Sequence, residues 1–541
     1  MGASLVVAFW SARMALLARL SIALIAGVAT GLAYPPYGWW LLLLPGLVGM
    51  LGVLEDQSAR RGAVLGLAFG VGYFGAMLPW LRVIGVDAWI VLTLLEAVFV
   101  AGFGAAAAVV RAHRWWPLAT AGLWVGVELA RSQLPFTGFP WGRVGFALAG
   151  TPLESYVRYL GVPALGALVV LAAAVVWWGL TRRAGTAAAL GAFTMVVGGL
   201  PVLGVVLPVG PAGSTETLRV AAVQGGVPGS GADGLGEQRE VVANHVRTTE
   251  AFAADVRAGR TEPADVVLWP ENSTDVDPFT DQQTYAAIDG AVQTVGVPVL
   301  VGAITAGSEP DLRRNVGLVW TPDTGPGDGY VKRHLVPFGE YIPLRDVFAP
   351  MISRLNEIPR DFEAGDEPGV LDLGPVVVGD SLCYDIAFDR AVAPAVREGA
   401  ELLVVQTNNA TYRDTGQPDQ QWAISRLRAI ETGRDLVVAS TNGISGVVAA
   451  DGTVLARSTT DGAVVITETV QLADGLTPAV RFGAWWERGL VTLGLIGLAV
   501  SAGTRVGRRT TTERPAAGGS APDAPGEPQQ SVGSGTPGRA T

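Results

Sequence analysis

Long apolar stretches are the feature that most constrains how this chain can fold. They fill residues 1–208 and return at 486–503, whereas 209–485 has the mixed composition of a water-soluble domain. A helix needs about 20 mostly apolar residues to cross a bilayer. Half of all residues are hydrophobic and 16% are charged, which is typical of an integral membrane protein. Eight spans are predicted, at roughly 14–33, 38–54, 62–81, 88–110, 115–130, 160–181, 187–208 and 486–503.

Arginines predict the orientation of these spans, because positively charged loops stay in the cytoplasm. Pairs of arginines follow the second, fourth and sixth spans, and three follow the last: Arg60, Arg61, Arg111, Arg114, Arg182, Arg183, Arg505, Arg508 and Arg509. The first span is expected to be a retained anchor rather than a cleaved signal peptide, since further spans follow it. Both termini are therefore expected on the cytoplasmic side of the membrane. The 209–485 domain, reached after seven crossings, is expected outside it.

The same composition divides the chain into four parts and excludes some functions. Residues 1–208 are expected to form a seven-span bundle, 209–485 the soluble domain, 486–503 the last span and 504–541 a disordered cytoplasmic tail. A net charge of −10 argues against nucleic acid as a partner. The histidines do not have the spacing of metal ligands, so no metal or cofactor is expected. They are His113, His245 and His334.

Strand-like and helix-like segments alternate in 209–485, which predicts an α/β layered domain. Several strands are continuous apolar runs, as is typical of strands buried on both faces. The predicted strands are 218–224, 265–269, 298–302, 315–320, 375–379, 401–405 and 436–440, and the predicted helices include 238–258, 282–295, 390–399 and 419–433.

The only cysteine and the only lysine of the chain, Cys383 and Lys332, both follow predicted strands, as does Glu271. A carboxylate can take a thiol proton and pass it to a leaving group, while an ammonium stabilises an oxyanion. Each residue also has a simpler reading. Glu271 could cap a helix, Lys332 could belong to a solvated basic patch with Arg333, and Cys383 could fill the core. Their joint occurrence at strand ends favours a catalytic site.

Several segments resemble successive motifs of the apolipoprotein N-acyltransferase family, membrane enzymes that carry a nitrilase-like domain. In the soluble domain these are Trp269-Pro-Glu-Asn272, Lys332-Arg-His-Leu-Val-Pro-Phe-Gly-Glu-Tyr-Ile-Pro343, Cys383-Tyr-Asp385, Gln406-Thr-Asn-Asn409 and Ser440-Thr-Asn-Gly-Ile-Ser445. Tyr34-Pro-Pro-Tyr-Gly38 and Phe136-Thr-Gly-Phe-Pro-Trp141 resemble loops of the family's membrane part. The resemblance covers about residues 14–505.

This resemblance implies a fold and a set of site residues. The fold is a polytopic α-helical membrane bundle of about eight spans plus an extracytoplasmic α/β nitrilase-like domain, an α-β-β-α sandwich. The implied catalytic triad is Glu271, Lys332 and Cys383. The residues implied to support the site or bind substrate are Glu340, Tyr384, Asp385, Asn408 and Asn409.

The chain departs from the family pattern in three places. The family often has glutamate where Asp385 stands, and many members have Trp-Phe where this chain reads Ala410-Thr-Tyr412. The segment after Gln224 lacks a tryptophan that some members have. These departures leave the triad intact and concern the contacts with lipid.

The expected reaction is a two-step acyl transfer by a monomer. A membrane phospholipid acylates Cys383, and the resulting thioester passes its acyl chain to the N-terminal amine of a diacylglyceryl-cysteine on an apolipoprotein. Because both substrates are lipid-anchored, a membrane bundle suits this reaction. Two alternatives remain open. A membrane-tethered nitrilase-type amidohydrolase would use water as the second nucleophile, and a non-catalytic lipid- or lipoprotein-binding protein would tolerate Cys383→Ala.

An apolar stripe follows Glu340. Val347, Phe348, Met351, Ile352 and Leu355 recur at helical spacing. The stripe is expected either to form a lid that dips toward the bilayer or to pack against its own domain.

Overall fold

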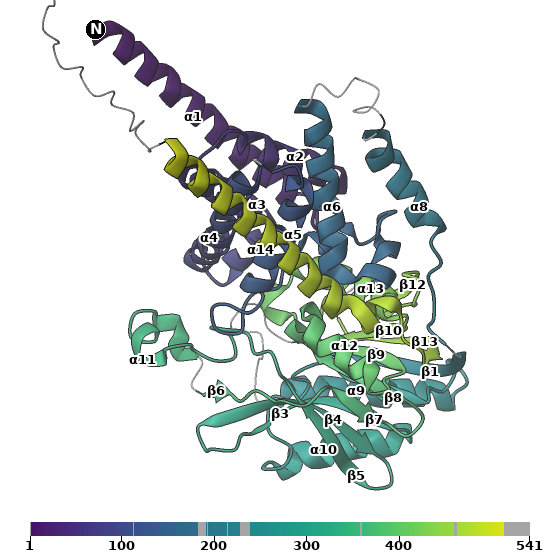
Figure 1. Ribbon diagram of the computed structural model, residues 1–541. Helices are drawn as coiled ribbons and strands as arrows, with labels where there is room; N and C mark the ends of the chain where they lie inside the picture. Colours follow the sequence, from purple (N-terminus) through teal and green to yellow (C-terminus); the bar gives the residue numbers. More distant parts are fainter. Residues whose placement is uncertain are drawn as a thin grey trace, which may run out of the picture.

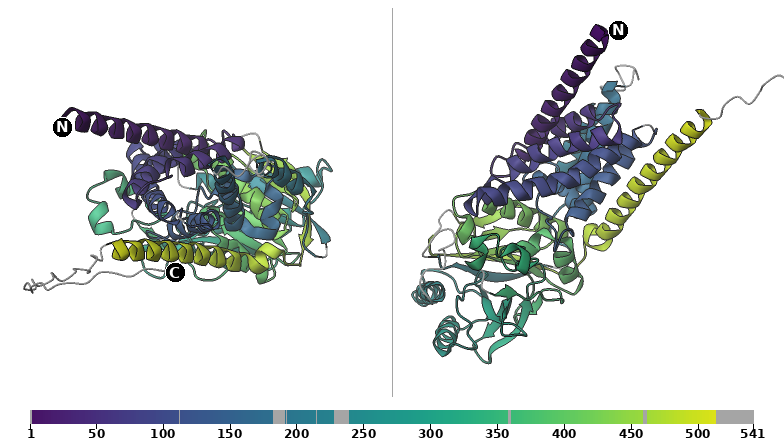
Figure 2. Two further views of the ribbon diagram at one scale, coloured as in Figure 1. Left: turned by 45° about the horizontal axis from the view of Figure 1, so that its top comes forward. Right: turned by 90° about the vertical axis from the view of Figure 1, so that its left-hand side faces the viewer.

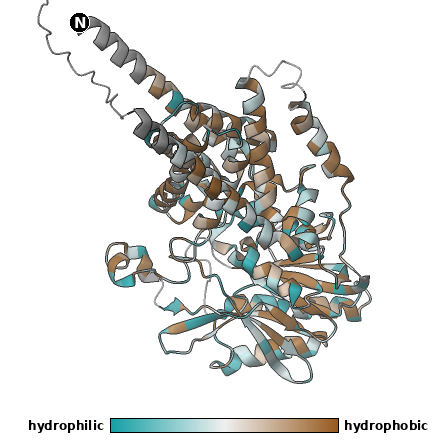
Figure 3. Cartoon of the chain, in the orientation of Figure 1, coloured by the Kyte–Doolittle hydropathy of each residue, from teal (hydrophilic) through white to brown (hydrophobic). Residues whose placement is uncertain are grey.

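A bundle of long helices is joined at one end to a domain built on two β-sheets (Figure 1). The computed structural model describes residues 2–111, 113–181, 191, 193–213, 215–227, 239–357, 360–458 and 462–512. Hydrophobic residues cover much of the bundle, whereas the two-sheet domain is mixed (Figure 3).

The bundle contains helices from both ends of the chain. α14 (Pro478–Thr512) follows the last strand of the domain and runs back along the bundle (Figure 2). The other helices of the bundle are α1 (Gly2–Gly31), α2 (Leu43–Val53), α3 (Ala59–Met77), α4 (Val86–Val110), α5 (Trp116–Arg131), α6 (Val157–Thr181) and α8 (Leu200–Val206).

Glycines allow the closest contacts between these helices. A Cβ placed on Gly62 of α3 would lie 2.4 Å from the Gly104 carbonyl oxygen of α4. A Cβ on Gly122 of α5 would lie 2.2 Å from the Leu490 carbonyl oxygen of α14. Close backbone approach at small residues is a common way for helices to pack in membranes, where lipid tails compete for apolar contacts.

Three helical segments are long and apolar enough to cross a membrane, within the part of the chain that the structure describes. They are Met14–Gly31, Val86–Val110 and Glu154–Thr181, and shorter apolar segments occur at Trp40–Val53 and Met195–Val206. Helices also occupy the other predicted spans, although the start of the seventh, with Arg182 and Arg183, lies outside the described residues. The predicted total of eight spans therefore stays a prediction.

The domain has two sheets. The first has the strand order β13-β1-β2-β3-β4-β5, with β6 paired to β4, and the second has the order β12-β11-β10-β9-β8-β7. The strands are β1 (Thr215–Gln224), β2 (Val266–Leu268), β3 (Val299–Ala306), β4 (Leu312–Thr321), β5 (Gly325–Val331), β6 (Asp361–Phe362), β7 (Val370–Asp372), β8 (Val377–Leu382), β9 (Leu402–Thr407), β10 (Leu436–Ser440), β11 (Gly446–Val448), β12 (Val454–Arg457) and β13 (Val464–Ala473). All seven predicted strands are confirmed.

Helices cover the outer face of each sheet. α9 (Glu240–Arg257) and α10 (Gln282–Val295) pack on the first sheet, and α12 (Asp389–Arg397) and α13 (Gln417–Thr432) pack on the second. Valine and leucine side chains fill the space between the sheets, for example Val220, Leu268, Val378 and Val404. These layers form the expected α-β-β-α sandwich. The α12–α13 layer also shares one continuous hydrophobic core with the bundle, so the second sheet is the one nearer the bundle.

The last helix is longer than the predicted span 486–503. It begins at Pro478 and continues to Thr512, so residues 504–512 of the predicted tail are helical. Its ends carry charged residues, which do not count toward an apolar span, and proline is well tolerated in a first helical turn. Because the ends of a helix do not locate a membrane, the bounds of the span stay a prediction. The remainder of the predicted tail, 513–541, lies outside the described residues.

The stripe after Glu340 is not one continuous helix. α11 (Arg345–Phe348) is a single turn, and a 3₁₀ turn follows at Ser353–Glu357. Pro350 separates the two, as expected of a residue that removes a helical hydrogen bond. Val347 and Met351 are exposed, whereas Leu355 is buried, so the stripe divides between solvent and the protein interior.

Candidate active site

The ends of three strands from both sheets meet at one place. Glu271 follows β2 closely, Cys383 follows β8 and Asn408 follows β9. Gln406 Nε2 donates to the Trp269 carbonyl oxygen at 2.6 Å, and the Asn408 N–H donates to Glu271 Oε2 at 3.0 Å. Because β8 and β9 are paired in parallel as far as the residue before Cys383, the cysteine lies beside this junction.

Lys332 lies between two carboxylates in the protein interior. Its Nζ donates to Glu271 Oε1 and to Glu340 Oε1, each at 2.8 Å, and its side chain is 2% exposed. Asn315 Nδ2 on β4 donates to the same two oxygens, at 2.7 and 3.0 Å. The second oxygen of Glu340 accepts the Val336 N–H at 2.8 Å. Two carboxylates therefore share one ammonium and one amide, which fixes their positions.

Burial controls the proton affinities in this cluster. It raises the pKa of Glu271 above its ordinary value, against the pull of the Lys332 ammonium. For Lys332 itself, burial acts to lower the pKa, but Glu271 and Glu340 hold it well above its ordinary value. Lys332 therefore keeps its proton, while Glu271 has the enhanced basicity that suits a general base.

Cys383 is the first residue of a 3₁₀ turn, Cys383–Ala387, and has a positive φ of 51°. Non-glycine residues rarely adopt this backbone conformation, and when they do, it often marks a functional site. Gln421 Nε2 on α13 lies 3.2 Å from the Cys383 carbonyl oxygen and 3.6 Å from Sγ. The side chain is half-buried.

The Cys383 sulfur is a neutral thiol at rest. Burial raises its pKa to about 12, and the negative charge of Glu271 contributes, whereas Lys332 and the Thr407 hydroxyl act to lower it. The charges of Glu271 and Lys332 thus both act on the sulfur. A thiol of this pKa needs a base to become a nucleophile, and Glu271 is the nearby carboxylate with raised proton affinity.

Asp385 ties the cysteine turn to the segment that carries the lysine. Its carboxylate accepts the Tyr330 hydroxyl at 2.7 Å, the His334 N–H at 3.0 Å and His334 Nδ1 at 2.7 Å. Arg390 Nε donates to His334 Nε2 at 2.7 Å, which places the ring proton on Nδ1. Burial acts to raise the pKa of Asp385, but these donors hold it below its ordinary value. Asp385 therefore stays ionised, and its hydrogen bonds hold the Cys383–Ala387 turn in place.

Tyr384 links the cysteine turn to the bundle. Its hydroxyl donates to the Gly138 carbonyl oxygen at 2.9 Å, in the loop after α5. Its ring stacks near-parallel on Trp141 of the same loop, with centroids 6.2 Å apart. Tyr412 meets Trp80 of the bundle edge-to-face, with ring centroids 5.2 Å apart. The bundle thus supplies aromatic rings that pack on Tyr384, next to the cysteine, and on Tyr412.

The structure brings together the three predicted catalytic residues and all five predicted supporting residues. Asn409 lies one layer further out, where its Nδ2 donates to Gln421 Oε1 at 3.0 Å. Sequence reasoning missed Asn315, Tyr330 and Gln421 as neighbours of the site. Tyr330 stands two residues before Lys332, so the alternation of a strand could have indicated it. No sequence signal marked Asn315 or Gln421.

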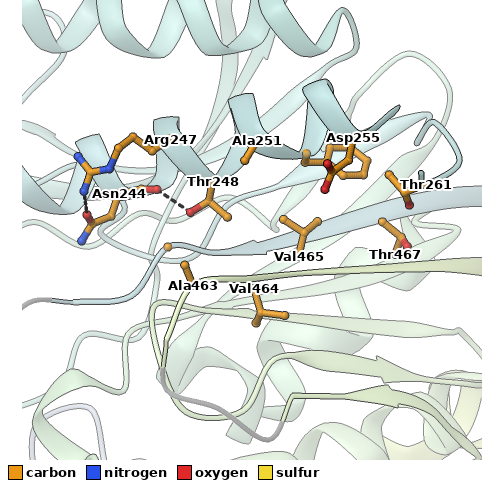
Figure 4. A pocket seen from close by; sticks show the side chains of 12 residues that line it. Asn244, Arg247, Thr248, Ala251, Asp255, Thr261, Ala463, Val464, Val465 and Thr467 are labelled. Carbon is orange, nitrogen blue, oxygen red and sulfur yellow. Dashed lines mark hydrogen bonds between the residues drawn. The ribbon is translucent and has the colours of Figure 1, made fainter. Parts of the chain in front are cut away.

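A surface pocket lies elsewhere on the domain. It has a volume of about 490 Å³ and lies between α9 and β13 (Figure 4). Asn244 and Thr248 of α9 face Val465 and Thr467 of β13 across it. None of the triad residues lines this pocket. Within the described residues, no cluster of three or more His, Cys, Asp or Glu side chains could hold a metal ion.

Comparison with known proteins decides the family. The N-terminal domain of apolipoprotein N-acyltransferases matches residues 26–175, and the carbon-nitrogen hydrolase domain matches 219–475. A protein from Mycolicibacterium smegmatis (strain ATCC 700084 / mc(2)155) named apolipoprotein N-acyltransferase is 35% identical over 510 residues, which are 90% of this chain and 85% of that protein. This chain belongs to the apolipoprotein N-acyltransferase family.

Other members match at similar levels. The apolipoprotein N-acyltransferase of Gloeobacter violaceus is 33% identical, with 89% of this chain and 94% of that protein covered. That of Nitrosomonas europaea is 31% identical, with coverages of 91% and 99%. Among solved structures, an amidase from Nesterenkonia sp. is similar at 21% identity. The match covers 48% of this chain and 91% of the amidase, with a TM-score of 0.35.

Proposed function

We propose that Cys383 is the nucleophile, Glu271 the general base and Lys332 the oxyanion-stabilising cation of an apolipoprotein N-acyltransferase. The observation that carries this assignment is the buried Glu271–Lys332 pair, joined at 2.8 Å, whose charges both act on the Cys383 sulfur. The protein is an acyltransferase of lipoprotein maturation, as its family membership establishes.

The first half-reaction acylates the cysteine. The Cys383 S–H proton moves to Glu271 while the sulfur attacks the ester carbonyl carbon of a membrane phospholipid. Lys332 stabilises the negative oxygen of the tetrahedral intermediate. The C–O bond then breaks, and the departing lysophospholipid oxygen takes the proton from Glu271. A thioester remains on Cys383, and Glu271 is ionised again.

The second half-reaction transfers the chain to the acceptor. The N-terminal amine of a diacylglyceryl-cysteine attacks the thioester carbon and loses a proton to Glu271. The C–N bond forms, the C–S bond breaks, and the Cys383 thiolate recovers the proton from Glu271. An amide on the lipoprotein and the free enzyme result, so no cofactor is consumed.

The surrounding residues position these three groups. Glu340 and Asn315 hold the Lys332 ammonium and the Glu271 carboxylate, and the Asn408 N–H fixes the second oxygen of Glu271. Asp385 orients the cysteine turn through its three hydrogen bonds, and Asn409 acts through Gln421. Tyr384 joins the turn to the bundle, next to where a lipid-anchored substrate arrives.

We also propose a topology for this membrane enzyme. Eight spans cross the bacterial plasma membrane, seven of them before residue 209 and the last within α14. Both termini lie in the cytoplasm and the catalytic domain lies outside, where the arginine-poor loops are. The enzyme acts as a monomer in the bilayer, with a phospholipid as acyl donor and a diacylated apolipoprotein as acceptor. Cysteine-accessibility mapping in intact cells tests this topology, with single cysteines introduced into a Cys383→Ser background.

The products of a reconstituted reaction test the proposed function. Full-length enzyme is incubated with phospholipid and a diacylated lipopeptide acceptor, and the lipids are separated. An N-acylated lipopeptide that appears in step with lysophospholipid supports the transferase. Free fatty acid without amide product would support the amidohydrolase instead. Retained activity in Cys383→Ala would refute the assignment of Cys383 as the nucleophile.

A further inference from the structure

A second carboxyl group is buried between the two sheets, close to the triad but outside its mechanism. Asp380 lies on β8, three residues before Cys383, and is 3% exposed. Among the described residues, neither of its carboxyl oxygens has a well-formed hydrogen bond, although the Ser381 N–H lies near enough to act on its pKa. A buried carboxylate with so little compensation is costly, because it has lost its water.

Gln406, on the neighbouring strand β9, also has a side-chain oxygen that lacks a hydrogen-bond partner. Its Nε2 donates to the Trp269 carbonyl oxygen, but its Oε1 has no donor among the described residues. Gly317 on β4 of the opposite sheet shows how close the two side chains are. A Cβ placed on Gly317 would lie 2.0 Å from Asp380 Oδ2 and 2.7 Å from Gln406 Oε1. Both oxygens therefore converge on the small space that the glycine leaves open.

Two acceptor oxygens that converge on one small buried space repel, unless one of them carries a proton. A protonated carboxyl supplies the missing donor, since it has one O–H. The amide of Gln406 cannot turn to supply it without releasing the Trp269 carbonyl. We propose that Asp380 is a neutral carboxylic acid that donates to Gln406 Oε1, and that it is a positioning residue for the catalytic base.

The electrostatic surroundings agree with this protonation state. Burial raises the pKa of Asp380 well above its ordinary value, and the negative charges of Asp385 and Glu271 raise it further. The two neighbours that converge on it from β4 and β9, Gly317 and Gln406, are uncharged. The Ser381 N–H acts to lower this pKa, but no cation is among the described groups that act on it, and the net shift is upward.

Gln406 connects Asp380 to the catalytic base. Its amide is held by the Asp380 proton on one side and holds the Trp269 carbonyl on the other, and Glu271 is two residues further along the chain. If the Gln406 amide were wrongly oriented, its hydrogen bond to the Trp269 carbonyl would be lost, and Glu271 would no longer be held in position. A neutral Asp380 also adds no further negative charge near Glu271 and Cys383. This inference rests on the role proposed for Glu271.

The test compares two replacements of the carboxyl in full-length enzyme. Asp380→Asn keeps a neutral group that can donate, and Asp380→Leu keeps the volume without a donor. The rate of Cys383 thioester formation from phospholipid is measured for each. We expect Asp380→Asn to stay within about threefold of wild type and Asp380→Leu to lose at least about tenfold, mainly in kcat, as for a lost buried hydrogen bond. Equal rates for both variants, or a tenfold loss in Asp380→Asn, would overturn the proposal.

A second readout does not depend on activity. A group with a raised folded-state pKa contributes stability that is fully present below its unfolded pKa and is lost as pH rises. Wild type should therefore lose melting temperature relative to Asp380→Asn as pH rises from about 4, the ordinary aspartate pKa. Asp328→Asn, at an exposed position on β5, controls for the loss of one carboxyl group. A melting-temperature difference that does not grow with pH would show an ionised Asp380 and overturn the inference.

The two readouts separate this inference from the proposed function. If wild type forms no thioester with any donor, the proposed function fails, while the pH dependence of melting still decides the protonation of Asp380. If Asp380→Leu does not fold, the pH dependence of Asp380→Asn decides alone.

Discussion

Gln420 accepts the indole N–H of Trp141 at 2.8 Å, across the boundary between the catalytic domain and the bundle. The same oxygen accepts the Trp80 indole at 3.0 Å, and Gln420 Nε2 donates to the carbonyls of Pro35 and Met77 at 2.8 and 2.9 Å. One buried amide on α13 thus uses four hydrogen bonds to hold three bundle segments. The next residue of α13, Gln421, contacts the cysteine.

Loss of this amide should slow the reaction with lipid more than the chemistry itself. In Gln420→Leu the two indoles lose their acceptor, and the aromatic rings beside Tyr384 and Tyr412 lose their fixed positions. We expect kcat/KM for a phospholipid donor to fall at least about tenfold, while acylation by a short water-soluble ester changes less than about threefold. Gln417→Leu, one turn earlier on α13, is the matched control. Equal losses with both donors would mean that Gln420 serves stability alone.

Removal of the base should affect the chemical step. In Glu271→Gln the thiol proton has no acceptor, so the rate of thioester formation should fall about 10²–10⁴-fold with little change in KM for phospholipid. Stopped reactions analysed by mass spectrometry provide the rate. Asn315→Leu leaves Glu271 in place and removes one of its donors without adding a charge, and serves as a control for disturbance of the cluster. A rate near wild type in Glu271→Gln would remove Glu271 from the mechanism.

Alkylation of the single cysteine reports its acidity directly. Because burial and Glu271 raise the thiol pKa to about 12, alkylation by a small neutral reagent should keep rising up to pH 10 without reaching a plateau. Glu271→Gln removes the negative charge and should make the thiol more acidic, so the variant that is impaired in acyl transfer should be alkylated faster at pH 8. If the alkylation rate of wild type reached a plateau below pH 9, the assignment of Cys383 as a neutral thiol would be contradicted.

Buried His245 should make the protein sensitive to acid. Burial lowers its pKa from 6.5 to about 4, although Nδ1 lies 2.8 Å from the Val241 carbonyl oxygen. The unfolded chain therefore takes up a proton first as pH falls, and stability is lost from pH 6.5 downward, by up to about 3 kcal/mol near pH 4. His245→Phe should flatten this part of the curve of melting temperature against pH. An unchanged acid slope would exclude His245 as its source.

The strands could be predicted from the sequence, and the triad could be proposed from it, because both leave local signals. Continuous apolar runs mark strands buried on both faces, and a lone cysteine or lysine after such a run is conspicuous. Asn315, Gln421 and Asp380 left no such signal, because their roles depend on contacts between strands and helices far apart in the chain. Gln420 likewise gains its four partners only when the bundle packs on α13.

The ends of the last helix were not predicted from the sequence, for a related reason. Hydropathy finds the apolar middle of a helix but not its charged ends, so α14 extends beyond the predicted span on both sides. The stripe after Glu340 had helical spacing, but Pro350 divides it, and Leu355 is buried while Val347 and Met351 are exposed. Spacing predicts a face only where the backbone forms the helix.

The most direct test of this account is the mass of the protein after exposure to phospholipid alone. Full-length enzyme should gain the mass of one acyl chain, the modified peptide should contain Cys383, and hydroxylamine should remove the group, as it does from thioesters. Addition of a diacylated lipopeptide should discharge the adduct as an amide. Absence of any adduct on Cys383 with every phospholipid tried, while lipopeptide acylation proceeds, would contradict the thioester mechanism.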